Sequence, residues 1–192
     1  MVGATIAGGG EAEWPNRVTD VFGVVGGGHD NQSGNNTGGT EDAPFATVGG
    51  GENNAASGVQ TTIGGGAHNA ASGERTTVGG GSNNAASGQE ATVAGGTCNT
   101  ASAGRATVGG GETNRASAWW ATIGGGSNNT ASGQETTVSG GEWNAAGGWI
   151  ATVGGGGENS ASGGGATIAG GHLNAVTGTM GFVGGGESNT AS

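Results

Sequence analysis

Apolar residues recur along this chain at one fixed spacing. From Val48 onward, a single valine or isoleucine followed by a run of mostly glycine residues returns every fifteen residues without a slip. These anchors are Val48, Ile63, Val78, Val93, Val108, Ile123, Val138, Val153, Ile168 and Val183. A fixed period of this length indicates a repeat protein in which similar units stack along one axis.

The residues around each anchor predict two short strands. We count the anchor as position 0, so that Thr occupies position −1 in nine of the ten regular repeats. The triplet Ala46–Val48 then places a small side chain inward, a hydroxyl outward and a β-branched side chain inward. This period-two pattern is typical of a strand. Ala-Ser-Gly at positions +8 to +10, as in Ala56–Gly58, predicts a second short strand that ends in a turn.

Glycine and asparagine occupy the other conserved-looking positions of the repeat. Positions +1 to +3 are nearly all glycine, which suits a chain that turns with positive φ or passes close to another backbone. Position +6 is asparagine in every regular repeat, and stacked amides can bond to one another and to turn backbone. We therefore predict a structural ladder made of Asn54, Asn69, Asn84, Asn99, Asn114, Asn129, Asn144, Asn159, Asn174 and Asn189.

These patterns predict an all-β fold, a parallel β-solenoid or β-roll of about twelve 15-residue coils that forms a single domain over residues 1–192. Residues 46–192 hold the regular repeats. Residues 1–45 hold irregular coils, because the anchors Ile6, Val25 and Val48 are spaced 19 and 23 residues apart. We expect loop insertions at about residues 11–20 and 35–45. Each coil buries little more than one valine and two small residues, so we also predict a homo-oligomer, with a side-by-side homotrimer favoured.

Composition and charge narrow the choice of partners. Glycine supplies 51 residues and hydrophobic types only 31%, which without the period would indicate disorder. The formal charge is −10 with no lysine, so we expect no nucleic-acid partner and no binding to an anionic membrane. Cys98 stands alone, which predicts no disulfide framework. No run is apolar enough to insert into a membrane, and the first ten residues lack the basic and apolar regions of a secretory signal.

The candidate for binding is a cluster of tryptophans at variable positions. Position +12 places Arg105 one coil before Trp120, in the arrangement of a cation–π pair. Position +11 holds Trp119 and Trp149 two coils apart, and we expect Trp143, at position +5, to lie nearby. Such a patch either stacks on the sugar rings of a host-surface glycan or protein, or is buried between protomers.

Catalytic, cofactor and metal sites are not expected. His29, His68 and His172 are predicted to lie far apart along the axis, with no carboxylate cluster that joins them. No acid, base and nucleophile converge, so we predict that the protein is not an enzyme and that it needs no cofactor or metal.

The repeat resembles the β-roll head of YadA-like trimeric autotransporter adhesins. That family's unit is similar to Gly-x-x-Ser-x-Ala-Ser-Gly followed by a short apolar strand, and it appears here as Gly51–Gly58, with Asn54 in the family's Ser place. The resemblance covers 46–192 well and 1–45 poorly, and this chain's period is one residue longer, within the glycine run. It implies parallel coils, a trimer about a long axis, and binding to surfaces rather than catalysis.

Together these observations predict a structural or adhesive extracellular fibre or adhesin-head segment at the cell surface. The chain begins at position +10 and ends at position +9, so a second copy would continue the period, and we expect end-to-end filaments. The alternative is a phage tail-fibre or receptor-binding segment located in the virion, which the missing secretory signal favours. An ice-binding solenoid is a weaker hypothesis, because a single file of threonine does not form a wide hydroxyl array.

Overall fold

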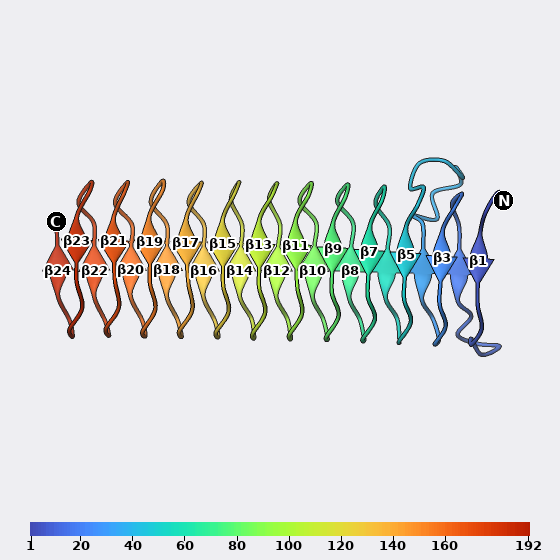
Figure 1. Cartoon of the computed structure of the whole chain (residues 1–192), viewed down its shortest axis with the longest axis horizontal. Coiled ribbons are helices and arrows are strands. Elements are labelled where there is room, and N and C mark those ends of the chain that lie inside the picture. Colours follow the sequence, from blue (N-terminus) through green and yellow to red (C-terminus); the bar gives the residue numbers. More distant parts are fainter. The chain divides into compact units, whose positions relative to one another are not determined.

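The protein is an all-β parallel β-solenoid of about twelve coils with a fifteen-residue period and no helix (Figure 1). This computed structural model describes residues 1–192. The chain divides into two compact units, Met1–Cys98 and Asn99–Ser192. The single domain expected over residues 1–192 stays a prediction. In each unit a coil contains two strands of two residues, and strands of successive coils pair in parallel.

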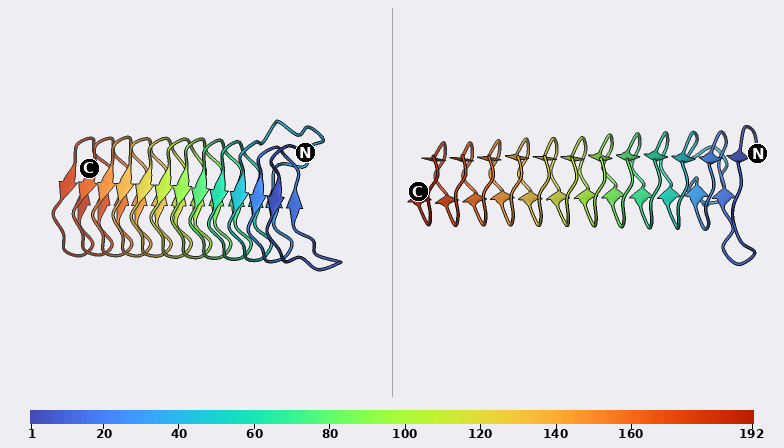
Figure 2. Two further views of the ribbon diagram at one scale, coloured as in Figure 1. Left: turned by 45° about the vertical axis from the view of Figure 1, so that its right-hand side comes forward. Right: turned by 60° about the horizontal axis from the view of Figure 1, so that its bottom comes forward.

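In the first unit the odd-numbered strands pair with one another, and the even-numbered strands do the same (Figure 2). The odd-numbered strands are β1 (Thr5–Ile6), β3 (Val24–Val25), β5 (Thr47–Val48), β7 (Thr62–Ile63), β9 (Thr77–Val78) and β11 (Thr92–Val93). The even-numbered strands are β2 (Arg17–Val18), β4 (Gln32–Ser33), β6 (Ala55–Ala56), β8 (Ala70–Ala71) and β10 (Ala85–Ala86).

The second unit follows the same rule. Its even-numbered strands are β12 (Thr100–Ala101), β14 (Arg115–Ala116), β16 (Thr130–Ala131), β18 (Ala145–Ala146), β20 (Ser160–Ala161), β22 (Ala175–Val176) and β24 (Thr190–Ala191). Its odd-numbered strands are β13 (Thr107–Val108), β15 (Thr122–Ile123), β17 (Thr137–Val138), β19 (Thr152–Val153), β21 (Thr167–Ile168) and β23 (Phe182–Val183). The register steps by one period, since Thr122 pairs with Thr137 and Ile123 with Val138.

The core of each coil is small and fully enclosed. Val48 at position 0, Ala46 at position −2 and Ala56 at position +8 are all completely buried, as the anchor pattern predicts. Where threonine replaces alanine at position −2, its hydroxyl donates to the carbonyl oxygen three residues earlier, as from Thr61 to Gly58 at 2.9 Å. Every buried side-chain nitrogen and oxygen has a hydrogen-bond partner, so the thin core carries no unpaired polar group.

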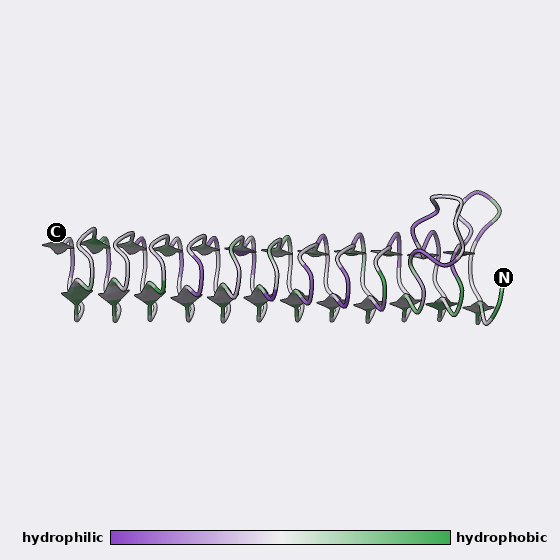
Figure 3. Cartoon of the chain, turned by 90° about the horizontal axis from the view of Figure 1, so that it is seen from above, coloured by the Kyte–Doolittle hydropathy of each residue, from purple (hydrophilic) through white to green (hydrophobic).

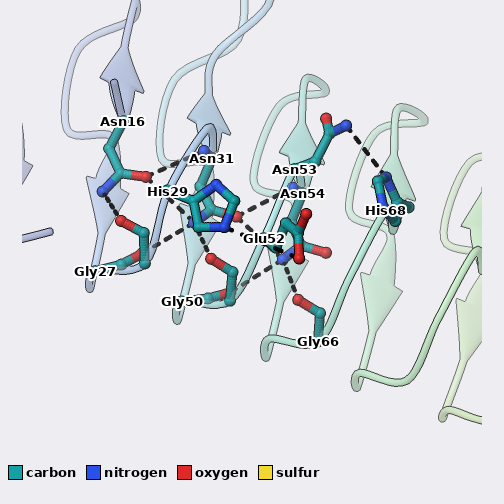
Figure 4. Close-up of polar contacts among 12 residues, drawn as sticks. Asn16, Gly27, His29, Asn31, Gly50, Glu52, Asn53, Asn54, Gly66 and His68 are labelled. Atoms are coloured by element: carbon teal, nitrogen blue, oxygen red, sulfur yellow. Dashed lines mark hydrogen bonds and ion pairs between the residues drawn. The ribbon is translucent and has the colours of Figure 1, made fainter. Parts of the chain in front are cut away.

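The predicted asparagine ladder is present within each unit, and it starts earlier than the regular repeats. Asn16 and Asn31 belong to it as well as Asn54, because they occupy position +6 of the irregular coils (Figure 4). The Asn54 amide nitrogen donates to Asn31 Oδ1 at 3.0 Å and to two glycine carbonyls, one in its own coil and one in the next. Each rung thus ties three coils together.

The strand boundaries differ from those predicted. The first strand of the regular coil is Thr47–Val48 rather than Ala46–Val48, and the second is Ala55–Ala56 rather than Ala56–Gly58. The second strand lies earlier because the in-and-out alternation begins at Asn54, which is buried, before the outward Ala55 and the buried Ala56. Assigning asparagine only to a turn hid this alternation.

Two insertions leave the first unit from opposite edges of its coils, and both contain hydrophilic stretches (Figures 1 and 3). The second follows β4 and agrees with the prediction for residues 35–45. The first is shorter than the predicted 11–20, because Asn16 already belongs to the ladder and β2 occupies Arg17–Val18. Asp20 is also part of the coil, where it is fully buried at position +10.

Asp20 holds the second insertion in place. Its Oδ2 accepts hydrogen bonds from the Thr19 hydroxyl and the Asn35 backbone N–H at 3.0 and 2.9 Å. Its Oδ1 accepts from the Ala43 backbone N–H at 3.3 Å, so one carboxylate binds both ends of the insertion. Farther out, the Thr37 hydroxyl donates to Asp42 at 2.6 Å and lowers the pKa of that carboxyl below its usual 3.8.

We expect Asp20→Ala to release this insertion at a local cost of about 1–3 kcal/mol, because two backbone N–H groups lose their acceptor. Faster amide hydrogen exchange at Asn35 and Ala43, with unchanged exchange in β7 and β9, would be the expected readout. Asp42→Asn is the matched control, since Asp42 is exposed and an amide oxygen can accept the same bond from Thr37. Unchanged exchange at Asn35 in Asp20→Ala would contradict the assignment.

Candidate functional site

Two turns of each regular coil carry the variable side chains, and both place a residue in the left-handed region. At position +5 Asn53, Asn128 and Trp143 have φ of 51°, 56° and 57°, and at position +12 Arg105 and Trp120 have φ of 56° and 57°. Non-glycine residues at these angles are uncommon. Here the backbone N–H of the left-handed residue bonds to the preceding coil, as from Trp143 to Ser127 O at 3.0 Å. Stacking therefore compensates for the strain and turns the side chain outward.

In the second unit, position +12 forms the predicted cation–π pair. The guanidinium carbon of Arg105 lies 5.6 Å from the ring centroid of Trp120, as the spacing predicts. The Trp119 and Trp120 rings lie 5.5 Å apart at 54°. A side chain at Gly104 would meet the Trp119 ring at 2.6 Å, so this indole lies directly on the glycine of the preceding coil. Arg105, Trp119 and Trp120 are thus brought together.

Trp143 is placed apart from the other tryptophans. It lies in the turn between β17 and β18, whereas Trp119 and Trp149 lie in the turns that follow the even-numbered strands β14 and β18. These two kinds of turn form opposite edges of the coil (Figure 1). Trp143 lines a separate hollow with Glu158 and Ser160, and Trp120 lines another with Glu135. The expected grouping of Trp143 with the position +11 tryptophans is therefore wrong.

All four of these tryptophans are about half exposed, with exposed fractions between 43% and 58%. We use the name tryptophan edge for Trp119, Trp120 and Trp149, which occupy the same kind of turn in the second unit. Monomeric soluble proteins seldom expose several large aromatic side chains close together. The tryptophan edge is consequently a candidate contact surface.

In the first unit, position +12 carries charge instead of aromatic rings. The Arg75 guanidinium contacts Gln60 at 3.3 Å, Glu74 at 3.1 Å and Glu90 at 3.6 Å. The predicted pairing of Arg75 with Glu90 is therefore confirmed. These groups are exposed, so such pairs contribute little to stability and mainly order the side chains along the edge.

A second hollow, also in the first unit, was not expected from the sequence. Trp14, His29, Asp30, Glu52, Asn53 and His68 line a pocket of about 300 Å³, which we call the Trp14 pocket. The backbone at position +4 pairs His29 with Glu52, and the Asn53 amide nitrogen lies 3.1 Å from His68 Nδ1 (Figure 4). The prediction that His29 and His68 lie far apart is wrong.

The reason for this error is the second insertion. It lengthens the sequence between His29 and Glu52 without lengthening the stack, so residues 39 positions apart in sequence lie two coils apart. His172 belongs to the second unit, where it lies near Glu158 and Glu187 at 3.5 and 3.7 Å. Counting coils rather than residues would have found the Trp14 pocket from the sequence.

Comparison with protein-family models and with curated proteins finds no match to this chain. The structure contains no group of three or more histidine, cysteine, aspartate or glutamate side chains arranged to hold a metal ion. It also contains no helix able to cross a membrane. The functional argument therefore depends on the two surfaces described above.

Proposed function

We propose that this chain is a non-enzymatic, adhesive structural protein, a segment of an extracellular or cell-surface fibre or adhesin head that contacts its target through the tryptophan edge. The half-exposed Trp119, Trp120 and Trp149 are the observation that carries this proposal. The indole of Trp119 lies flat on Gly104 and exposes its other face, which suits stacking against a sugar ring or an apolar side chain.

The design of the coil supports a presenting role. Buried positions hold the same few residue types in successive coils, whereas the two left-handed turns accept tryptophan, arginine, glutamate, asparagine and isoleucine alike. The backbone hydrogen bonds of these turns do not depend on the side chain. A solenoid of this kind can vary its surface without changing its frame.

We further propose that the chain assembles as a side-by-side homotrimer and that such trimers join end to end. The support is energetic, because each coil buries one valine or isoleucine with small residues and Asn. Packing coils of several chains together would add apolar burial that one chain lacks. The resemblance to YadA-like adhesin heads favours the same assembly. Sedimentation of the purified chain should give three times the 17.8 kDa protomer mass, and a monomer would contradict this part of the proposal.

The adhesive role is tested by Trp119→Ala combined with Trp149→Ala. We expect at least a tenfold loss of binding to the target cell surface or glycan, because aromatic anchors carry much of the energy of a contact. Gln134→Ala is the control, since Gln134 lies at position +11 between the two tryptophans. Loss of the oligomer with the tryptophans would instead assign them to an interface between protomers. Unchanged binding and assembly would contradict both roles.

A phage tail-fibre or receptor-binding segment is the alternative, and it would use the same edge. Binding of the purified chain to bacterial rather than eukaryotic cells, lost in the same double variant, would favour it. The ice-binding hypothesis predicts thermal hysteresis, and none is expected, because the outward threonine of each odd-numbered strand is followed by an inward anchor and then mostly glycine.

A further inference from the structure

The Trp14 pocket combines residues from four different turns of the first unit. Trp14 comes from the first insertion, His29 and Asp30 from the turn between β3 and β4, and Glu52 with Asn53 from the turn before β6. His68 closes the pocket from the turn before β8. Only here does an insertion add an aromatic wall to the edge of the coils that carries positions +4 and +5.

The wall of the pocket is fixed by backbone hydrogen bonds. The Trp14 carbonyl accepts from the Asp30 N–H at 3.1 Å and from the Glu11 N–H at 3.3 Å. The Trp14 N–H in turn donates to the Glu11 carbonyl at 3.1 Å. The indole is therefore held beside the first turn while about half of its surface stays exposed. Such an ordered and exposed aromatic face is suited to binding a ligand.

The charge of the pocket favours a cation. Two carboxylates, Asp30 and Glu52, line it, and the whole chain carries a formal charge of −10. Asp30 already binds the Arg17 guanidinium at 3.1 Å. Glu52 is half exposed, and the basic group beside it is the His29 imidazole at 3.9 Å. At neutral pH, with histidine uncharged, Glu52 is left with a negative charge next to an aromatic face.

The fold itself contains the contact that such a site would make. In the second unit the Arg105 guanidinium lies over the Trp120 ring at 5.6 Å. In the first unit a guanidinium binds a carboxylate at the rim of the Trp14 pocket, between Arg17 and Asp30. A planar guanidinium can stack on an indole and donate to a carboxylate at the same time, whereas an ammonium group offers no planar face.

We propose that the Trp14 pocket binds a guanidinium group, supplied either by a free arginine-like molecule or by an arginine side chain of a peptide. The guanidinium lies against the Trp14 indole and donates hydrogen bonds to Glu52. Asn53 and the two imidazoles form the polar rim that positions the rest of the ligand. This inference is independent of the tryptophan edge, which belongs to the second unit.

The test is an NMR titration of the full chain that follows the indole N–H signal of Trp14, with the other tryptophans as internal references. N-acetyl-arginine amide should shift this signal with a dissociation constant on the order of 1 mM, the range of a small ligand held by few contacts. Glu52→Gln, which keeps the shape of the side chain, should weaken binding at least about fivefold. Glu112→Gln should leave it unchanged, because Glu112 lies at position +4 of a regular coil with no insertion over it.

The choice of ligands decides between outcomes. Tighter binding of glycyl-arginyl-glycine identifies a peptide arginine as the source, and equal binding identifies the free molecule; both support the proposal. Equal binding of N-acetyl-lysine amide or of a neutral methyl glucoside would overturn the guanidinium assignment. Absence of a shift at Trp14, or equal weakening by Glu52→Gln and Glu112→Gln, would overturn the site itself.

Discussion

Asn129→Asp is expected to destabilise the second unit by about 3–5 kcal/mol, the range seen when a buried charge is left without a partner. Asn129 is fully buried, and its amide nitrogen donates to Gly125 O at 3.0 Å and to Gly141 O at 2.8 Å. An aspartate would place a charged oxygen against both carbonyls. Only the bond that Asn129 Oδ1 accepts from the Asn144 N–H, at 3.0 Å, would survive.

The effect should depend on pH. Burial beside two carbonyl oxygens raises the pKa of the new carboxyl above that of an unfolded aspartate, about 3.9. The variant is therefore most stable below this value, and it loses stability as the pH rises through the higher pKa of the folded state. Denaturant unfolding at several pH values, with amide exchange at Asn144 as a local readout, measures both effects.

The neighbouring asparagine provides the matched control. Asn128 lies at position +5, in the left-handed turn, and its amide nitrogen donates only to the Ser127 hydroxyl at 2.8 Å. Asn128→Asp should cost less than about 1 kcal/mol, because aspartate also adopts this backbone conformation and its charge reaches solvent. Equal losses in the two variants would show that the ladder contributes no more than a surface turn does.

The period was enough to predict the inward positions of the coil, because burial repeats with the sequence. Val48, Ala46 and Asn54 occupy the buried sites that the pattern assigns to apolar, small and amide side chains. The left-handed turns were not predicted, since the usual signal is glycine and positions +5 and +12 carry residues such as Trp143 and Arg105. Here hydrogen bonds between coils decide the conformation, and a single repeat does not reveal them.

The candidate sites followed the same division. Arg105 and Trp120 were predicted to meet because they occupy one position in adjacent regular coils. The Trp14 pocket was missed because both insertions interrupt the count between Trp14, His29 and Glu52. Sequence distance measures spatial distance only where the period is unbroken. The irregular first unit therefore holds the site that the sequence concealed.

Gly126→Ala is expected to destabilise the second unit by about 2–4 kcal/mol, although it adds only one methyl group. Gly126 lies at position +3 with φ of +86°, where an L side chain is strained whatever the space. A Cβ there would overlap the carbonyl oxygen of Gly141 and lie 2.8 Å from the Asn129 amide nitrogen. The substitution would push Asn129 away from Gly141, so strain in the turn and loss of a ladder hydrogen bond occur together.

Gly124→Ala separates this effect from simple crowding. Gly124 lies at position +1, where a Cβ would also meet a carbonyl of the next coil, that of Ser139. Yet Ser139 and Ala169 already carry side chains at position +1, whereas position +3 is glycine in every regular coil. We therefore expect Gly124→Ala to cost less than about 1 kcal/mol in the same unfolding measurement. A loss as large as that of Gly126→Ala would mean that coil spacing alone, rather than backbone conformation and the ladder, requires glycine at position +3.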